Sequence, residues 1–386
     1  MDHSIQKIGH EMKAQNIFHY LNLAYSVVSL ILLAGCGAPP ATQSVIATED
    51  KPVPVTETPT IDISPTVAST ATSTAASIAP STAAPLPECS IPYFEPVAFL
   101  PGGNQLLVKS DGKISILDTD TWAINKTFDT SAPLDSVVAL SPDGQLLAVT
   151  QSDYSIQLFN VEDEKLINTL SGHTDIITEL KFSPESDRLF SASHDTWVRV
   201  WDTTGKLESE FQPTGADDIP SEVLGMSLSP DGTQLATIPL DGPVKLWDMP
   251  DFKEIAAVGG SGGYDTSDVE YSHDGQFLAA DLATGLWIWD ITDNSMLVNG
   301  INSMAFDFSP ALDALAYADV SDENRIVFYS LAEKQQIFKT QGTTDLIWML
   351  MYFPDGSKLI SVGDRETRIW NVTNGVLLYR GCNSAQ

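Results

Sequence analysis

The sequence has few basic side chains. Its 386 residues hold 20 Lys and Arg against 51 Asp and Glu, a formal net charge of −31. Phosphate backbones and anionic lipid surfaces are both bound by clusters of Lys and Arg. We therefore expect the chain to bind neither nucleic acid nor a bare anionic membrane surface. An excess of acid instead favours solubility and basic protein partners.

Cysteine and histidine are also scarce, with three Cys and six His in the whole chain. Beyond the first 20 residues only His173, His194 and His273 remain, and their spacing does not suit a zinc site. Residues 259–263 match the G-x-S-x-G pattern, which indicates a hydrolase only at a strand-to-helix elbow. Here the pattern lies in a Gly-rich loop between two expected strands. We therefore expect no catalytic residue, no metal and no cofactor.

The longest apolar run, Leu21–Gly35, is about 15 residues long. A membrane span needs roughly 20 apolar residues, so the run fits the core of a secretory signal, with Lys13 as its positive flank. Asp2 and Glu11 are acidic where such a signal is usually basic. We therefore expect translation to start at Met12 rather than at Met1.

The run ends in Leu33, Ala34 and Gly35, directly before Cys36. This ending resembles the lipobox of bacterial lipoproteins, which implies cleavage before Cys36 and a diacylglycerol on its thiol. Two acyl chains are enough for stable membrane anchoring. The alternative is an ordinary secretory signal followed by an unrelated Cys.

Residues 37–87 consist mostly of Thr, Ala, Pro and Ser. Such a segment buries too little apolar surface to offset the entropy lost on ordering. We expect a disordered tether with a root-mean-square span of roughly 40 Å.

The rest of the chain is organised by a phrase that recurs about every 40 residues, a period typical of stacked structural units. The phrase is Ser-Pro-Asp-Gly or a relative, which makes a tight turn between two strands. Its seven copies are Leu100–Gly103, Ser141–Gly144, Ser183–Ser186, Ser229–Gly232, Ser272–Gly275, Ser309–Leu312 and Phe353–Gly356.

A second phrase, often Trp-Asp, follows each turn by about 18 residues and closes an alternating strand. Its copies are Leu117-Asp118, Phe159-Asn160, Trp201-Asp202, Trp247-Asp248, Trp289-Asp290, Tyr329-Ser330 and Trp370-Asn371. Each unit then holds four short strands, and four antiparallel strands in radial repetition form a propeller blade. The sequence predicts an all-β, seven-bladed β-propeller over 89–386. It is preceded by a signal peptide (1–35) and by the lipidated Cys with its linker (36–88).

The third unit resembles the WD-repeat family, because it carries Gly172-His173, Ser183-Pro184 and Trp201-Asp202. In that family a His, a Ser or Thr, an Asp and a Trp form a hydrogen-bonded relay that braces the blade. The matching positions of the third and fourth units are His173, Ser191, Asp195 and Trp201, and Thr237, Asp241 and Trp247. The other units keep little of the relay, so we expect apolar packing to hold them.

A propeller must also join its last blade to its first. Aligning the repeats places Cys89 and Cys382 at neighbouring positions of the loop between consecutive blades. We expect a disulfide there, which an exported protein can form. The alternative is two unrelated buried thiols.

A partner surface is expected on the face where the blade-joining loops and the relay turn open. Aromatic and acidic side chains there suit a basic protein. The candidates are His194, Trp197, Asp217, Asp218, Tyr264, Asp265 and Trp348. Trp197 and Trp348 could equally be packed between blades.

Three classes of function remain open, because a propeller alone does not choose among them. We expect a monomeric protein-binding scaffold outside the cytoplasm, lipid-anchored to a membrane of the cell envelope. The alternatives are a sensor or carrier of a small ligand in the central channel, and a propeller lyase or hydrolase. The last would need convergent titratable groups, which the sequence does not indicate.

Overall fold

The structure is a computed structural model that describes residues 88–130, 132–133, 135–260, 262–263 and 268–383. The predicted signal peptide, the predicted lipidation site Cys36, residues 37–87 of the predicted linker, Tyr264 and Asp265 lie outside these residues. Within the described part, no helix is long and apolar enough to cross a membrane.

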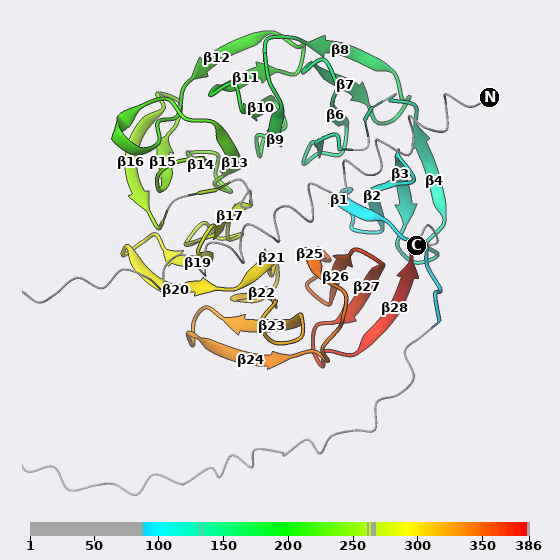
Figure 1. Cartoon of the computed structure of the whole chain (residues 1–386). Helices are drawn as coiled ribbons and strands as arrows, with labels where there is room; N and C mark the ends of the chain where they lie inside the picture. Colours follow the sequence, from blue (N-terminus) through cyan, green and yellow to red (C-terminus); the bar gives the residue numbers. More distant parts are fainter. Residues whose placement is uncertain (1–87, 131, 134, 261, 264–267, 384–386) are drawn as a thin grey trace, which may run out of the picture. The chain divides into compact units, whose positions relative to one another are not determined.

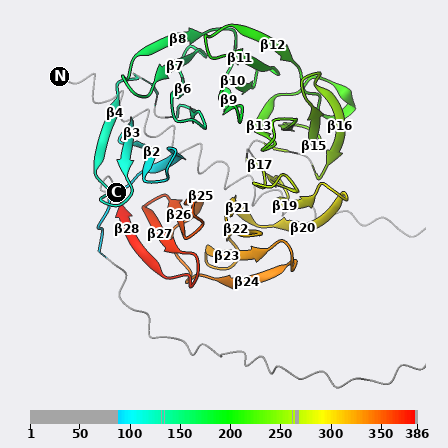
Figure 2. The ribbon, with the colours of Figure 1, turned by 180° about the vertical axis from the view of Figure 1, so that it is seen from behind.

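The described residues form seven four-stranded antiparallel sheets arranged as the blades of a ring (Figure 1), and Figure 2 shows the same ring from behind. Blades 1 to 4 are β1 Glu95–Phe99, β2 Gln105–Ser110, β3 Lys113–Asp118, β4 Ile124–Phe128; β5 Val138–Leu140, β6 Leu146–Thr150, β7 Ile156–Asn160, β8 Leu166–Leu170; β9 Ile177–Phe182, β10 Arg188–Ser193, β11 Val198–Asp202, β12 Leu207–Phe211; and β13 Val223–Leu228, β14 Gln234–Pro239, β15 Val244–Asp248, β16 Lys253–Val258. Blades 5 to 7 are β17 Val269–Tyr271, β18 Phe277–Leu282, β19 Gly285–Asp290, β20 Ser295–Ile301; β21 Ser303–Phe308, β22 Ala314–Asp319, β23 Arg325–Ser330, β24 Gln335–Lys339; and β25 Ile347–Tyr352, β26 Lys358–Gly363, β27 Glu366–Asn371, β28 Leu377–Cys382. The prediction of a seven-bladed β-propeller is confirmed.

The position of each strand in its blade follows from its apolar content. The two middle strands are apolar on both faces and almost fully buried, as in β14 and β18, whereas outer strands such as β24 are polar and exposed. Each core cluster joins side chains of two adjacent blades, for example Leu278 of blade 5 with Ala236 of blade 4. Burying one Leu in this way contributes roughly 1.5–3 kcal/mol. Stability is thus shared along the ring.

The Ser-Pro-Asp-Gly turns have the geometry that their sequence predicts. Ser141 Oγ donates to Asp143 Oδ1 at 2.6 Å, and Gly144 N donates to the Ser141 carbonyl at 2.8 Å. Gly144 has a φ of 72°, which side chains disfavour. Each turn therefore specifies one tight hairpin between the first and second strands.

The same turns also contact one another around the ring. A Cβ on Gly144 of blade 2 would lie 2.6 Å from Pro101 Cδ of blade 1, so the glycine leaves room for the proline of the preceding blade. At the seam, Pro354 of blade 7 lies over Gly103 of blade 1 in the same way. The seventh blade is therefore packed on the first as the other blades are packed on one another.

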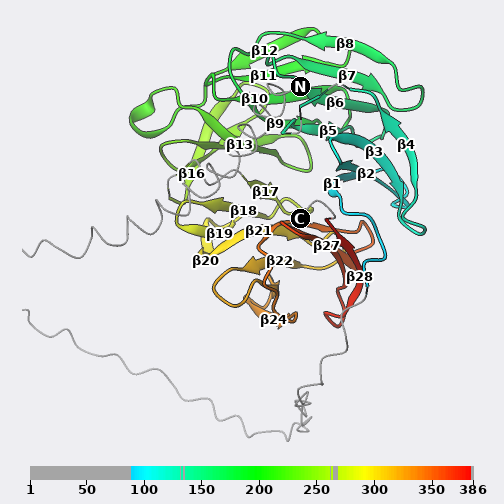
Figure 3. The same ribbon diagram turned by 45° about the vertical axis from the view of Figure 1, so that its right-hand side comes forward.

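The ring is fastened at this seam by the segment before β1. Cys89 and Cys382 form a disulfide with a Cα–Cα distance of 5.6 Å, within the range that such a bond requires. Residues 89–94, here called the strap, run beside β28 (Figure 3), with Ile91 paired to Gly381. Blade 7 keeps its own fourth strand, and the strap is added to it.

Candidate binding face

The relay of blade 3 is assembled from β10, β11, the turn between them and the loop before β9. Trp201 Nε1 donates to Ser191 Oγ at 2.9 Å, and Ser191 Oγ lies 2.7 Å from His173 Nε2. His173 Nδ1 lies 2.9 Å from Asp195 Oδ2. Arg199 Nη1 also lies 2.6 Å from His173 Nδ1, so both ring nitrogens of His173 contact polar groups of the blade. All four predicted relay residues are brought together.

The Asp195 carboxylate is the most heavily bonded group of this relay. Besides His173 it accepts from Thr174 N at 3.0 Å and from Arg199 Nη1 at 2.9 Å. Burial alone would raise the pKa of Asp195, but these hydrogen bonds and the cationic partner hold it well below its usual range. The turn that follows β10 is therefore fixed by an ionised carboxylate.

Blade 4 keeps part of the relay. Trp247 Nε1 donates to Thr237 Oγ1 at 2.9 Å, as predicted from the alignment. Asp241 has no His beside it and accepts instead from the Ser221 hydroxyl. Blade 7 also keeps one link, since Trp370 Nε1 donates to Ser361 Oγ at 2.8 Å. The bond in blade 7 is an addition to the sequence-based account.

In these three blades a buried cation lies two residues before the Trp, and the sequence analysis missed all three. Arg199 pairs through Nε with Glu210 on the outer strand at 3.0 Å. Lys245 Nζ contacts Glu254 at 2.9 Å, and Arg368 Nε contacts Glu366 at 2.7 Å. For Arg199 and Lys245 the signal was present as a basic residue between apolar neighbours of the third strand. Arg199 and Lys245 tie the third strand to the outer strand of their blade, whereas Arg368 pairs with an acid of its own strand.

The loop between blades 3 and 4, residues 212–221, forms a short projection that we call the finger. Its base is closed by pairing of Thr214 with Pro220, and its tip is the 3-10 turn η1 Ala216–Asp218. Lys245 Nζ donates to Thr214 Oγ1 at 2.8 Å, and Ala216 N donates to the Asp241 carbonyl at 2.8 Å. The finger is thus held by Lys245 and by the turn of blade 4 that contains Asp241.

The finger carries two of the predicted partner residues, Asp217 and Asp218, with φ values of 58° and 56°. Next to them Ile219 leaves 62% of its surface exposed, and Ile176, before the first strand of blade 3, leaves 54%. Asp175 beside Ile176 is also exposed. These five exposed residues, Asp175 and Ile176 before β9 and Asp217, Asp218 and Ile219 in the finger, lie at the same end of blades 3 and 4 as the relay turn, and we call them the relay-face patch. It combines aliphatic side chains with carboxylates, the chemistry that suits an apolar and basic partner.

The other predicted partner residues take different positions. His194 N donates to the Ile176 carbonyl at 2.9 Å, and the His194 ring lies 3.9 Å from Glu222, so His194 borders the patch. Trp197 is half-buried, with the Arg199 guanidinium 5.7 Å from its ring centre. Trp348 is half-buried too, but it lies in blade 7 and packs on the core between blades 7 and 1. The structure therefore separates Trp348 from the patch.

Charged side chains converge on the first strands of blades 3, 5 and 6, which border the centre of the ring (Figure 1). Lys181 lies 3.4 Å from Glu179, and the nearby charges of Glu179, Asp268 and Glu270 raise the pKa of Lys181. Burial raises the pKa of Asp307 to about 7. Lys181 keeps 42% of its side chain exposed, so water reaches this centre. The expectation that titratable groups do not converge is wrong for this part of the molecule.

A cavity of about 610 Å³ between blades 7, 1, 2 and 3 shares Glu179 and Lys181 with this charged group. Glu95, Lys109, Glu179 and Lys181 line it on the polar side, and Trp348 is part of its apolar lining. In the described part of the chain, no three His, Cys, Asp or Glu side chains gather so as to hold a metal ion. The cavity thus combines acidic, basic and aromatic side chains in its lining.

Comparison with known proteins agrees with the repeat pattern. Residues 164–202, which include the complete relay up to Trp201, match the family described as WD domain, G-beta repeat. The chain is 30% identical over 129 residues to the Periodic tryptophan protein 2 homolog of Schizosaccharomyces pombe, covering 32% of this chain and 14% of that protein. It is 25% identical over 239 residues to the Transcriptional corepressor LEUNIG_HOMOLOG of Arabidopsis thaliana, covering 60% and 29%.

Protein groucho of Drosophila melanogaster is 29% identical over 147 residues, which cover 37% of this chain and 20% of that protein. In each case the match spans less than a third of the relative's own length. None of the three names describes an enzyme. The matches, the seven blades and the relay together support the resemblance of this chain to the WD-repeat family.

Proposed function

We propose that the chain is an extracytoplasmic scaffold, anchored to a membrane through a lipid on Cys36, that binds a basic protein through the relay-face patch. The binding part is supported by the exposed aliphatic side chains of Ile176 and Ile219, which have carboxylates next to them in the sequence. Hydrogen bonds from Arg199 and Lys245 hold the loops that carry them. The anchoring part rests on the apolar run and the Leu-Ala-Gly-Cys ending at residues 33–36.

Rigidity of the patch favours a role in recognition. Arg199 and Asp195 fix the turn beside Ile176, and Lys245 fixes the base of the finger. A surface that is ordered before binding loses less conformational entropy when a partner docks. An aliphatic centre with charged surroundings then supplies an apolar contact and electrostatic steering together.

The disulfide supports a location outside the cytoplasm. Both cysteines of the propeller are consumed by the Cys89–Cys382 bond. Bonds of this kind persist in oxidising compartments and are rare in the cytosol. The tether of residues 37–87 would hold the propeller tens of ångströms from the bilayer, free to meet partners in the envelope.

The binding proposal is tested by capture with matched variants of the full-length protein. Wild-type protein, a patch variant with Asp217→Asn, Asp218→Asn and Ile219→Ser, and Asp251→Asn as a control would be immobilised and exposed to envelope extract. Asp251 is exposed at the other end of blade 4. We expect one protein to bind wild type and the control but not the patch variant, and to bind less as salt increases. Equal capture by all three would contradict the proposal.

The anchoring proposal is tested separately with Cys36→Ser. We expect this variant to lose labelling by a radioactive fatty acid and to leave the membrane fraction, because two acyl chains provide the attachment. A Cys36→Ser protein that still sediments with membranes would show that another feature anchors it. That result would leave the patch experiment unaffected.

A second candidate function is the binding of a small ligand in the centre of the ring, which the cavity of about 610 Å³ favours. Its lining combines Glu179 and Lys181 with Trp348, as expected of a site for a partly apolar, charged metabolite. A metabolite screen by thermal shift would identify such a ligand. Glu179→Gln should then abolish the shift while leaving protein capture intact.

A further inference from the structure

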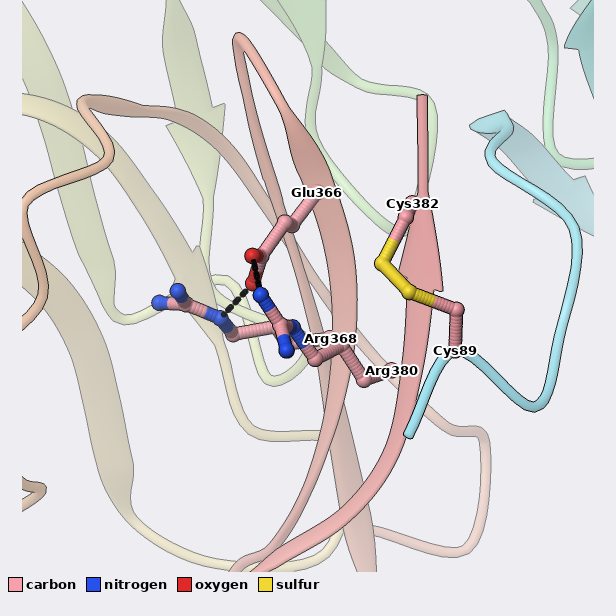
Figure 4. The surroundings of a disulfide bond; sticks show 5 residues. All are labelled: Cys89, Glu366, Arg368, Arg380 and Cys382. Atoms are coloured by element: carbon pink, nitrogen blue, oxygen red, sulfur yellow. Dashed lines mark hydrogen bonds and ion pairs between the residues drawn. A yellow bond between two sulfur atoms is a disulfide. The ribbon is translucent and has the colours of Figure 1, made fainter. Parts of the chain in front are cut away.

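The disulfide of the seam lies where a reductant can reach it. Cys89 and its neighbour Ser90 are exposed, and Cys382 at the end of β28 is half-buried. Figure 4 shows the bond on the side of β28 that faces the strap, with Cys89 at the end of the strap segment. Exposed disulfides are the ones that exchange readily with thiols, whereas buried ones resist reduction.

The outer part of the strap has few other attachments. Ser90 N and Ile91 N both donate to the Arg380 carbonyl, at 2.8 and 3.3 Å. Gly381 makes this approach possible, because a Cβ there would collide with the Pro92 carbonyl. The Ile91 side chain is buried, and it is the single apolar anchor among residues 89–91. The disulfide is therefore the strongest constraint on this end of the strap.

The inner part of the strap is attached independently of the disulfide. Phe94 is completely buried, its N–H donates to Thr367 Oγ1 at 3.2 Å, and Thr367 Oγ1 donates to the Phe94 carbonyl at 2.8 Å. The Tyr93 hydroxyl donates to the Gly363 carbonyl at 3.2 Å. Val362 and Phe94 also share one core cluster. Breaking the disulfide would leave this second fastening in place.

Strand β28 is likewise held without the disulfide. Glu366 on β27 accepts from both Arg368 and Arg380, so it pins Arg380 of β28 to its own blade (Figure 4). The four-stranded sheet of blade 7 also continues to Cys382, which is paired with Glu366. Loss of the bond should therefore release the strap from β28 rather than β28 from blade 7.

We propose that Cys89–Cys382 is a thiol–disulfide exchange site whose reduction unlatches the outer strap while the blades stay folded. The co-reactant is a dithiol. One of its thiolates attacks the exposed Cys89 sulfur, the Cys89–Cys382 bond breaks, and Cys382 leaves as a thiolate that takes up a proton. The second thiol of the reductant then attacks the mixed disulfide and releases Cys89 as a thiol. Two electrons and two protons pass to the protein, and the dithiol becomes a disulfide.

The consequence is a change at the seam that depends on redox state. With the bond intact, the chain before β1 leaves the propeller from the end of β28. After reduction, residues 89–91 are free to move away from β28, and the chain leaves from Phe94. The outer edge of blade 7, covered by the strap in the oxidised protein, becomes open to solvent.

Hydrogen exchange of the full-length protein with and without dithiothreitol tests this proposal. We expect the amides of Ser90 and Ile91 to exchange at least about tenfold faster after reduction. Without the covalent bond to β28, the outer strap should open more often and expose these amides to solvent. The amides of Phe94 and of β14 and β15 in blade 4 should change by less than about twofold. A double variant, Cys89→Ser with Cys382→Ser, should exchange like the reduced wild type and ignore dithiothreitol.

Gly381→Ala gives a second measurement that leaves the thiols in place. It should displace the strap and release free thiols faster than wild type at the same dithiothreitol concentration. The proposal is overturned if dithiothreitol releases no thiol from the folded protein or if reduction leaves exchange of Ser90 and Ile91 unchanged. It is also overturned if protection is lost throughout the propeller.

Discussion

Arg199 and Lys245 hold the same place in neighbouring blades, two residues before a buried Trp and each paired with a glutamate of its outer strand. Each also reaches a loop of the binding face, Arg199 through Asp195 and Lys245 through Thr214. The two cations thus connect the core of each blade with the surface that we propose for docking.

Lys245→Ala should destabilise the propeller and loosen the finger. Lys245 is only 4% exposed, and its removal leaves Thr214 and Glu254 without their partner. Because Glu254 keeps some contact with water, we expect a loss of about 1–3 kcal/mol in the free energy of unfolding. Urea unfolding measures this loss, and hydrogen exchange of residues 212–221 measures the loosening. Lys165→Ala, in an exposed pair with Asp163, is the control and should leave the unfolding free energy almost unchanged.

Asp195→Asn should lower the free energy of unfolding by an amount that depends on pH. The pKa of Asp195 is lower in the folded protein than in the unfolded chain, so ionised Asp195 stabilises the fold above about pH 4. That contribution disappears as the pH falls through the pKa that Asp195 has in the folded protein. We expect a loss of about 2–4 kcal/mol at neutral pH and a smaller one at about pH 3. Urea unfolding at both pH values would contradict this account if the two losses were equal.

Asp307→Asn should have the opposite dependence. Burial raises the pKa of Asp307 to about 7 in the folded protein, so the wild type loses stability as the pH rises from about 4 to about 7. The Asn side chain at position 307 does not titrate, so the variant should lack this decrease in stability. We expect the variant to exceed the wild type by about 1 kcal/mol or more at about pH 8 and by little at about pH 4. A variant that keeps the wild-type slope would show that Asp307 is not the group responsible.

Gly144→Ala and Gly232→Ala separate the two reasons for glycine at the turns. Both residues have positive φ, 72° and 68°, so both substitutions strain the backbone by a similar amount. A Cβ on Gly144 would approach Pro101 to 2.6 Å, whereas on Gly232 it would stay 3.4 Å from Pro184. We expect Gly144→Ala to be the more destabilising by about 1–2 kcal/mol, measured by urea unfolding. Equal effects would show that the contact between blades adds nothing.

The architecture could be predicted from the sequence because every blade repeats the same local signals. Turns such as Ser141–Gly144, followed by strands that end near Trp-Asp, specify the hairpins directly. The period then sets the number of blades. The relay of His173, Ser191, Asp195 and Trp201 could be located for the same reason, since each member has a fixed offset from the turn.

The remaining features depend on contacts that no local pattern contains. Arg199 and Lys245 resemble ordinary surface cations in the alternating third strand. Their burial follows from contacts with residues distant in sequence, such as His173 for Arg199 and Thr214 for Lys245. Lys181, Glu270 and Asp307 come from three different blades and meet only in the folded ring. The shape of the finger depends on Lys245 and Asp241 of the following blade.

Photo-crosslinking in intact cells is the sharpest test of docking at the relay-face patch. A photoreactive amino acid would replace Ile219 in one full-length variant and Asp251, at the other end of blade 4, in a second. We expect the probe at position 219 to crosslink one envelope protein and the probe at position 251 not to crosslink it. Crosslinking of the same proteins from both positions, or of none from position 219, would contradict it.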